Sequence, residues 1–205
     1  MKKVLITGAT SGIGYATLKE LVNKYEVIFT YHHNEEKALE ITSKYHIKGY
    51  YLDLGDKESI EKLVDSIDNI DILINNAAIC LDNSFEDKTY MEFSKVVNVN
   101  LTGTYYLTKL LSKKINNGGN ILFISSTNGI DTYYIESIDY DASKAGVISL
   151  MHNFAKQLAP IRVNAIAPGW VDTEMNISLS PDFRKQEENK ILLNIIWLIF
   201  VHIVI

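Results

Sequence analysis

Short runs of apolar and β-branched residues alternate with amphipathic stretches along most of this chain. The runs at residues 4–7, 27–30, 49–52, 70–75, 120–125 and 162–167 predict β-strands. The stretches at residues 13–24, 34–45, 57–67, 90–116 and 140–159 predict helices, the fourth as one helix or as two. Strands that are apolar almost throughout and are separated by helices are typical of a parallel sheet with both faces covered.

This alternation predicts an α/β fold: one doubly wound domain of the Rossmann type, with helices on both faces of a parallel sheet. The length of 205 residues suits a single domain, and no linker, repeat or low-complexity segment divides residues 1–205. In such sheets ligands bind beyond the carboxyl ends of the strands. The residues that follow each predicted strand are therefore the candidates for function.

Composition narrows the classes of function. The formal net charge is −5 and Lys and Arg form no cluster, so we expect no nucleic-acid partner. The five histidines show no ligand-like spacing, so we expect no metal site. The single cysteine, Cys80, excludes an internal disulfide, and the start of the chain lacks the apolar segment of a signal peptide. We therefore expect a cytoplasmic protein.

A glycine-rich segment follows the first predicted strand and opens the first predicted helix. It reads Thr7-Gly8-Ala9-Thr10-Ser11-Gly12-Ile13-Gly14. Glycines allow a tight turn and let the backbone approach a diphosphate, while the helix N-terminus supplies N–H groups and positive potential. In this position the segment predicts nucleotide binding. A glycine-rich turn without a ligand is the alternative.

Tyr140 and Lys144 form a second candidate site. A spacing of four residues places both side chains on one face of a helix, one turn apart. A neighbouring ammonium group stabilises a phenolate, so we expect Lys144 to lower the pKa of Tyr140 and to allow proton transfer near neutral pH. The spacing alone is weak evidence, because such pairs are usually found on a solvated helix face.

Four more segments stand in order at predicted strand ends or on the helices that follow them. They are Asn75-Asn76-Ala77-Ala78, Asn98-Val99-Asn100-Leu101, Ile124-Ser125-Ser126 and Pro168-Gly169-Trp170-Val171-Asp172-Thr173. With a glycine segment spaced TGxxxGIG rather than GxGxxG, the set resembles the short-chain dehydrogenase/reductase family. It is similar in particular to the family's 3-oxoacyl-(acyl-carrier-protein) reductases. The resemblance covers residues 1 to about 175, and Ala78 stands where the family usually has glycine.

The resemblance implies hydride transfer between a nicotinamide cofactor and a carbonyl or secondary alcohol. Tyr140 would act as the general acid in reduction, and Lys144 would hold the nicotinamide ribose. Ser126 would bind the carbonyl oxygen. Asn100, with Asn98 as the alternative, would hold a water that links Lys144 to solvent.

The resemblance also implies a set of cofactor contacts. The expected residues are Gly8, Thr10, Ser11, Gly12, Ile13, Gly14, Tyr31, His32, Asp53, Leu54, Asn75, Ala77, Tyr140, Lys144, Pro168, Gly169, Val171 and Thr173. NAD-selective members carry an acidic residue at the end of the second strand, whereas this chain has Thr30-Tyr31-His32-His33. His32 or His33 could meet a 2′-phosphate, with Ser11 adding a hydrogen bond. We therefore expect NADP(H), with NAD(H) as the alternative.

The substrate end is specified less closely. We expect a small carbonyl compound or a 3-oxoacyl thioester, and residues 79–87 and 130–137 to border its pocket. By resemblance we expect a homodimer or homotetramer, and no membrane partner.

The end of the chain departs from the resemblance. Residues up to about 190 are family-like, whereas 13 of the 15 residues from 191 to 205 are apolar. We expect the family's usual last helix and strand to be missing. A shifted reading frame, a replacement edge strand and a membrane anchor are alternative explanations of this tail, although 15 residues are fewer than the roughly 20 that span a bilayer. A non-catalytic or defective nucleotide-binding relative is the corresponding alternative function.

Overall fold

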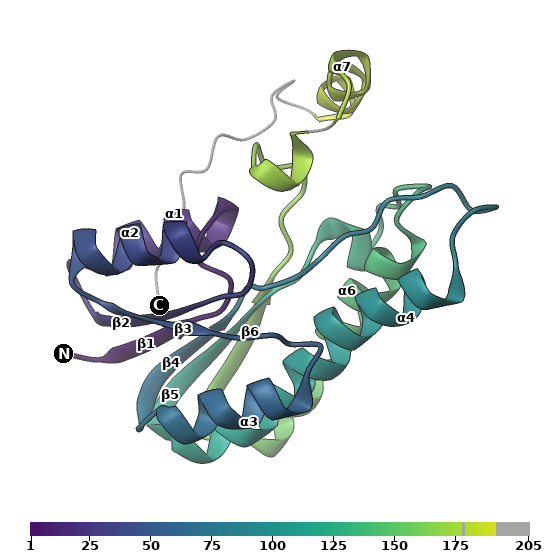
Figure 1. The fold of residues 1–205 in the computed structure, drawn as a ribbon. Helices are drawn as coiled ribbons and strands as arrows, with labels where there is room; N and C mark the ends of the chain where they lie inside the picture. Colours follow the sequence, from purple (N-terminus) through teal and green to yellow (C-terminus); the bar gives the residue numbers. More distant parts are fainter. Residues whose placement is uncertain (178, 192–205) are drawn as a thin grey trace.

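A six-stranded parallel sheet forms the centre of the protein (Figure 1). The computed structural model describes residues 1–177 and 179–191. The strands are β1 (Lys3–Ile6), β2 (Glu26–Tyr31), β3 (Lys48–Tyr51), β4 (Ile70–Asn75), β5 (Ile115–Ile124) and β6 (Arg162–Ile166). Their order is β3-β2-β1-β4-β5-β6, and every neighbouring pair is parallel. The predicted doubly wound α/β sheet is confirmed.

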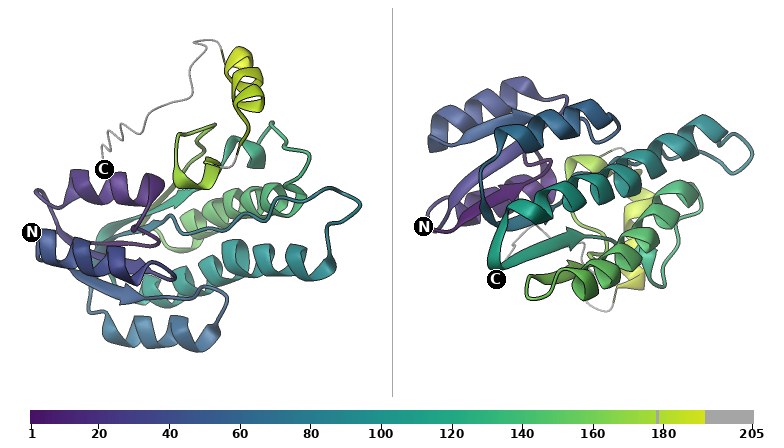
Figure 2. Two further views of the ribbon diagram at one scale, coloured as in Figure 1. Left: turned by 45° about the horizontal axis from the view of Figure 1, so that its top comes forward. Right: turned by 90° about the horizontal axis from the view of Figure 1, so that it is seen from below.

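Helices cover both faces of this sheet (Figure 2). One face carries α1 (Gly12–Leu21) and α2 (Glu35–Tyr45). The other carries α3 (Lys57–Ser66), α4 (Tyr90–Val97), α5 (Thr104–Leu111) and α6 (Ile138–Gln157). Each face has its own apolar core, and the strands contribute alternate residues to the two cores. In β1, for example, Val4 and Ile6 face α1 while Leu5 faces the opposite layer.

The stretch predicted as one or two helices over residues 90–116 forms two helices, because a π-helical turn at Asn98–Gly103 separates α4 from α5. The predicted end at residue 116 is wrong, since a short 3₁₀ turn at Ser112–Lys114 leads directly into β5 at Ile115. Ile115 pairs with Ile70 in β4, so tertiary pairing overrides the local helical pattern there.

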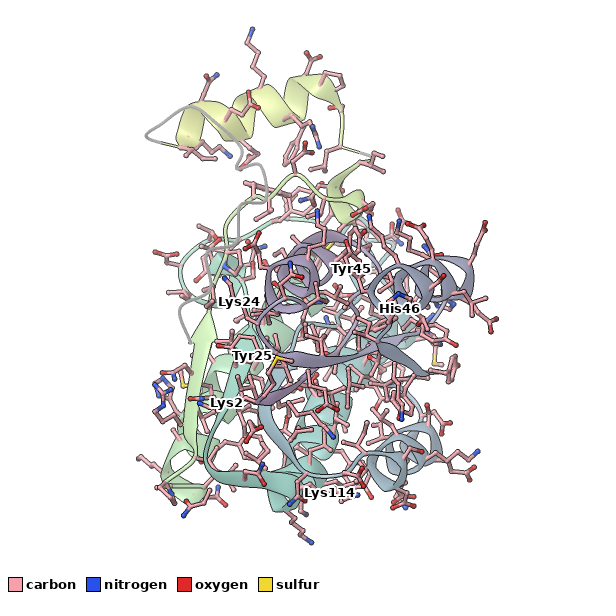
Figure 3. All side chains as sticks on the ribbon, turned by 90° about the vertical axis from the view of Figure 1, so that its left-hand side faces the viewer. Lys2, Lys24, Tyr25, Tyr45, His46 and Lys114 are labelled. Carbon is pink, nitrogen blue, oxygen red and sulfur yellow. The ribbon has the colours of Figure 1, made fainter. Side chains whose placement is uncertain are left out.

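At the end of the sheet opposite the site segments, one lysine side chain is hydrogen-bonded to the backbone at the end of α3. Lys114, labelled in Figure 3, donates hydrogen bonds to the carbonyl oxygens of Val64 and Ile67 at 2.6 and 2.7 Å. These bonds engage carbonyl groups at the end of α3, where Val64 otherwise accepts only the Ile67 N–H at 3.3 Å. They fix α3 to the start of β5.

The chain beyond β6 rises away from the sheet and forms α7 (Pro181–Lys190), which stands clear of the two helical layers (Figure 1). The apolar tail expected from residue 191 onward lies, except for Ile191 itself, outside the described residues. Among residues 1–177 and 179–191, no helix is both long and apolar enough to span a bilayer.

Gly103 ends the π-helical turn against the backbone of Leu54, and a methyl group there would overlap the Leu54 carbonyl oxygen. We predict that Gly103→Ala lowers the free energy of unfolding by about 1–3 kcal/mol, since either backbone must shift. Urea denaturation monitored by circular dichroism measures the change. Gly169→Ala is the control, because its methyl group would meet only the Thr127 hydroxyl, 4.0 Å away. Equal unfolding midpoints for the two variants would contradict the prediction.

Candidate active site

The predicted site segments all lie at one edge of the sheet. The glycine segment follows β1, Tyr31 ends β2, and Asp53 follows β3. Ala77 follows β4, Ser126 follows β5, and the segment that begins at Pro168 follows β6. Because all six strands are parallel, their carboxyl ends meet at this edge. The fold therefore brings the segments together as the sequence predicts.

The glycine turn is tied to the end of β4 by a two-way set of hydrogen bonds. The Thr7 hydroxyl oxygen accepts the N–H groups of Asn76 and Ala77 at 2.9 and 3.0 Å. In return the Asn76 side-chain amide donates to the carbonyl oxygens of Thr7 and Gly8 at 3.0 and 2.9 Å. The shape of the turn thus depends on a residue almost seventy positions away.

Two glycines in this turn are required by space and backbone geometry. Gly8 has a φ of 64°, and a methyl group on it would come within 2.9 Å of Ala77. A methyl group on Gly14 would come within 2.5 Å of the Asn76 side-chain amide. The turn can therefore keep its close contact with β4 only without side chains at these positions.

The N-terminus of α1 receives no capping hydrogen bond from its own N-cap side chain. Ser11 is the N-cap residue, but its side chain makes no capping hydrogen bond, and the first turn holds no acidic residue. The Gly12 N–H instead donates to the Glu174 carboxylate at 2.9 Å, from the segment after β6. Thr173 lies beside this contact, 3.4 Å from the position a Gly12 methyl group would take. The predicted residues Ser11, Gly12 and Thr173 are thus brought together.

The residues expected around the adenosine end of the cofactor differ in the burial of their side chains and in the partners these have within the protein. The His32 imidazole lies 3.5 Å from the Asp53 carboxylate and packs on His33, with ring centroids 3.8 Å apart. Asp53 also accepts the Gly55 N–H at 2.7 Å, which shapes its own loop. Leu54 is buried in the core, so it offers a ligand only its backbone.

Asn75 was expected to contact the cofactor, but its side chain has a partner within the protein. Its side chain is buried and donates to the Thr108 hydroxyl on α5 at 3.0 Å. The amide therefore fastens β4 to α5, and the neighbouring Asn76 is the residue that supports the glycine turn.

Ser126, Tyr140 and Lys144 come together where β5 ends beside α6. The Ser126 hydroxyl lies close enough to the Tyr140 phenol to lower its pKa. The Lys144 ammonium group lies 5.3 Å from the centre of the Tyr140 ring and donates to the Ile124 carbonyl oxygen at 2.8 Å. The Ser125 hydroxyl donates to the Lys144 carbonyl at 2.9 Å and so fixes α6 against β5. Lys144 is buried and Tyr140 is partly buried, so the pair does not lie on a fully solvated helix face.

Burial shifts the pKa values of both Tyr140 and Lys144. Burial raises the pKa of Tyr140 above its ordinary value, and the nearby Cys80 thiol raises it further, while the Ser126 hydroxyl lowers it. Burial lowers the pKa of Lys144 to about 8. The net direction for Tyr140 is opposite to the expected one, because the loss of water around the phenol outweighs the other contributions.

Asn100 lies in the π-helical turn, and its side chain is fully engaged. Its amide oxygen accepts the Ile79 N–H at 2.8 Å, and its amide nitrogen donates to the Ile79 carbonyl at 2.8 Å. The same nitrogen donates to the Ser143 hydroxyl at 3.1 Å, and Ser143 in turn donates to the Tyr140 carbonyl at 2.7 Å. Asn100 therefore connects the segment after β4 to the tyrosine helix. Asn98 instead donates to the Gly55 carbonyl at 3.0 Å.

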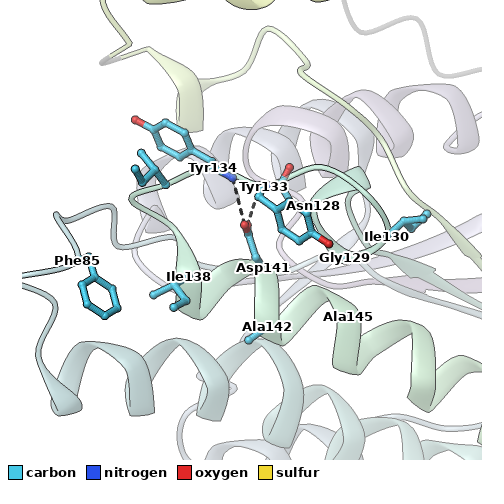
Figure 4. Close-up of a pocket in the computed structure, with 11 residues that line it drawn as sticks. Phe85, Asn128, Gly129, Ile130, Tyr133, Tyr134, Ile138, Asp141, Ala142 and Ala145 are labelled. Carbon is cyan, nitrogen blue, oxygen red and sulfur yellow. Dashed lines mark hydrogen bonds between the residues drawn. The ribbon is translucent and has the colours of Figure 1, made fainter.

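A buried carboxylate, Asp141, holds the loop after β5 (Figure 4). It accepts hydrogen bonds from the Asn128 amide at 2.7 Å, the Ser137 hydroxyl at 2.9 Å and the Tyr134 N–H at 3.1 Å. Three donors from one loop compensate the loss of water around this charge. Asp141 thus anchors residues 128–137 to the start of α6.

A second buried charge belongs to Asp139, which precedes Tyr140 in the sequence as Asp141 follows it. Asp139 is fully buried, and its carboxylate lies 3.1 Å from the Lys88 ammonium group, which is itself almost fully buried. Lys88 also donates to the Leu81 carbonyl, and Asp139 accepts the Tyr140 N–H at 2.9 Å. This ion pair fastens the segment around residues 80–88 to the first turn of the tyrosine helix.

A cavity of about 630 Å³ lies between the loop after β5 and α6 (Figure 4). The α6 residues that line it include Ile138, Ala142 and Ala145. At 100° per residue these positions lie on a different helix face from Tyr140 and Lys144. The loop residues expected to border a pocket between Ser126 and Tyr140 line this cavity on the other face instead; they include Ile130, Tyr133 and Ile135.

Three aromatic rings connect the loop after β5 to α7. Tyr134 meets Trp170 with ring centroids 5.9 Å apart and Phe183 with centroids 5.4 Å apart. Trp170 and Phe183 are 5.7 Å apart, and the Trp170 indole N–H donates to Glu187 at 3.0 Å. The segments after β5 and β6 therefore form one apolar contact with α7 above the site edge.

Several side chains at the site have no motif of their own that identifies them. The buried charges next to Tyr140 come from Asp139 and Asp141, and only the structure shows that Lys88 pairs with the first of them. Asn76 belongs to a segment that the sequence singles out, so its place near the cofactor turn could be found, although its partners could not. Glu174 gives no signal in the sequence.

The fold and the site together define a class of protein. A doubly wound sheet presents a glycine turn at the start of α1 and, at the same edge, a tyrosine–lysine pair with a serine beside the tyrosine. This combination is typical of α/β domains that bind a dinucleotide.

Comparison with known proteins places the chain within this class. The family model described as short chain dehydrogenase matches residues 2–184. A 3-oxoacyl-[acyl-carrier-protein] reductase of Aquifex aeolicus is 35% identical over 204 residues, which cover 93% of this chain and 82% of that protein. An L-rhamnose 1-dehydrogenase (NAD(P)(+)) of Azotobacter vinelandii is 31% identical over 204 residues, covering 91% and 79%. The chain belongs to the short-chain dehydrogenase family of oxidoreductases.

Solved structures agree with this assignment. A short chain dehydrogenase from Burkholderia cenocepacia, solved in complex with NADP, superposes with a TM-score of 0.89 at 26% identity. The match covers 96% of this chain and 85% of that one. The six-stranded sheet with its surrounding helices is therefore the architecture of the family.

The lowered pKa of Lys144 predicts a pH dependence of catalysis. Tyr140 stays protonated throughout the working range, whereas Lys144 loses its charge as the pH rises through about 8. We predict that kcat/KM of the oxidoreductase reaction falls above about pH 8, measured from initial rates between pH 6 and 10. Lys144→Met should lower the rate by about 10²-fold or more and abolish this dependence. Lys156→Met, on the same helix, should leave it unchanged; a flat profile in the wild-type protein would contradict the prediction.

Proposed function

We propose that this protein is an NADP(H)-dependent oxidoreductase that transfers hydride between the nicotinamide ring and a carbonyl or secondary alcohol. The observation that carries the proposal is the contact of Ser126 with Tyr140 and of Tyr140 with Lys144, at the sheet edge where the glycine turn also lies. The turn fits a dinucleotide, because its glycines let it pack closely against the end of β4 at the start of α1, and the Ser11 side chain makes no capping bond to the helix N-terminus.

Each side chain has a proposed role. When bound, the nicotinamide supplies or accepts the hydride. Tyr140 donates its phenolic proton to the substrate oxygen during reduction, and its raised pKa keeps that proton in place until charge develops on the oxygen. Ser126 orients the same oxygen, since its hydroxyl already lies against Tyr140. Lys144 stabilises the phenolate that forms and holds the cofactor ribose.

Asn100 is proposed to act on this centre from the π-helical turn. Its bonds to Ile79 and Ser143 hold the turn beside Tyr140, where a water could pass protons between Lys144 and solvent. The role of relay itself rests on the family resemblance.

NADP(H) is favoured over NAD(H) by the end of β2. That strand ends without an acidic side chain that would bind a ribose 2′-hydroxyl and repel a 2′-phosphate. His32 and His33 lie at this position with their rings together. The relative from Burkholderia cenocepacia was solved with NADP, which supports the same preference.

The substrate is proposed to be a carbonyl compound, with a 3-oxoacyl thioester as the specific candidate. The 35% identity with a 3-oxoacyl-[acyl-carrier-protein] reductase supports this candidate. A relative named for L-rhamnose oxidation at 31% identity shows that the same architecture also serves sugars. A panel of ketones, sugars and 3-oxoacyl thioesters therefore tests the substrate class.

The proposed mechanism predicts the effect of removing one hydroxyl group. Tyr140→Phe should lower kcat for NADPH-dependent ketone reduction by about 10²- to 10⁴-fold, because the proton donor is lost. Its affinity for NADPH, measured by fluorescence titration, should change little. Tyr133→Phe is the matched control, since the Tyr133 side chain is exposed on the loop after β5. Full turnover in Tyr140→Phe would exclude Tyr140 as the proton donor.

The cofactor preference predicts a second outcome. The double variant His32→Ala/His33→Ala should bind NADPH about tenfold more weakly, because charge-assisted hydrogen bonds to the 2′-phosphate are lost. Binding of NADH, which has no 2′-phosphate, should be unchanged. His152→Ala, on the exposed face of α6, serves as the control. Equal losses for NADPH and NADH would show that the histidines only support the local fold.

A further inference from the structure

The contact between Gly12 and Glu174 joins two parts of the chain that lie 162 residues apart. The Gly12 N–H is the first backbone donor of α1, and its partner is a carboxylate oxygen at 2.9 Å. A helix N-terminus carries positive potential and unsatisfied N–H groups, and it attracts whichever anion is nearest. In this protein the anion at the end of α1 is a side chain of the protein itself.

The first turn of α1 supplies no acidic or capping side chain of its own. The first turn of α1 lacks Asp and Glu, and Ser11, a residue type that commonly caps helices, makes no side-chain capping bond here. Gly12 itself has a φ of 50°, a conformation that favours glycine. The Glu174 carboxylate therefore occupies a donor that the remainder of α1 leaves open.

Glu174 is presented by a short, well-bonded turn. The Asn176 side chain donates to the Val171 carbonyl at 2.7 Å, and the Asn176 N–H donates to the Thr173 carbonyl at 3.0 Å. Arg184 on α7 forms an ion pair with Asp172 at 2.7 Å. The turn is thus held by its own segment and by α7, and a hollow of about 350 Å³ lies between it and the outer face of α1.

We propose that Glu174 is a built-in competitor for the cofactor diphosphate. Its carboxylate holds the Gly12 N–H until the diphosphate arrives, and the two anions cannot share one helix N-terminus without strong repulsion. Binding of the dinucleotide therefore displaces Glu174 and releases the turn at residues 171–177 from α1. The same carboxylate promotes release of the spent cofactor by reclaiming the donor. This proposal rests on the dinucleotide binding proposed above and assigns to Glu174 control of its affinity.

The test is the variant Glu174→Gln, which keeps the shape of the side chain and removes its charge. We expect it to bind NADPH and ADP about five- to tenfold more tightly than the wild-type protein, and NADPH to dissociate more slowly in stopped-flow fluorescence. Affinity for adenosine, which has no phosphate, should be unchanged. Glu188→Gln on α7 is the matched control and should behave as wild type. Glu174→Ala, checked for an unchanged melting temperature, should tighten binding in the same direction.

The outcomes separate this proposal from the proposed function. If the wild-type protein binds NADPH and ADP but Glu174→Gln binds them equally or more weakly, Glu174 is no competitor and the inference is overturned. If adenosine binding tightens as much as ADP binding, the effect is not on the phosphates and the inference is likewise overturned. If neither the wild-type protein nor either variant binds a nucleotide, both the proposed function and the inference are wrong.

Discussion

The parallel pairing of β1 with β4 at the centre of the sheet is the constraint on which the rest of the structure depends. From β1 the chain winds outward through β2 and β3 on one side, and through β4, β5 and β6 on the other. The connections leave β1 and β4 on opposite faces, so a crevice opens where these two strands end. Thr7 and Asn76 bridge the crevice and give the glycine turn its shape. Every other site segment reaches the same edge only because the strands are parallel.

Burial then determines the chemistry that this edge can perform. The packing that closes α6 against β5 takes Tyr140 and Lys144 out of water, which raises the pKa of the phenol and lowers that of the amine. The raised pKa keeps the phenol neutral, and the lowered pKa makes the ammonium group easier to deprotonate. Two buried carboxylates, Asp139 and Asp141, are compensated by a lysine and by three hydrogen-bond donors, so they act as anchors of the surrounding loops. The packing of the helices and loops therefore determines where the charged side chains of the site lie.

The central strands β1, β2 and β4 were predictable because both of their faces are buried, which forces most of their residues to be apolar. The helix over residues 90–116 was predicted less well. A π-helical turn and a strand pairing between Ile115 and Ile70 replace parts of it, and neither has a local signature. The site segments were found from their positions after strands. The pKa direction of Tyr140 was not, because burial depends on what packs over the ring.

The sequence by itself determined the order of strands and helices, the glycine turn at the start of α1, and the placement of Tyr140 and Lys144 on one helix face. These features follow from local periodicity and backbone sterics, which act over a few residues. Only the tertiary structure decided that Asn76 supports the glycine turn, that Lys88 neutralises Asp139, and that Glu174 caps α1. Such contacts join residues 51 to 162 positions apart, and their strength comes from burial and mutual approach that no local pattern encodes.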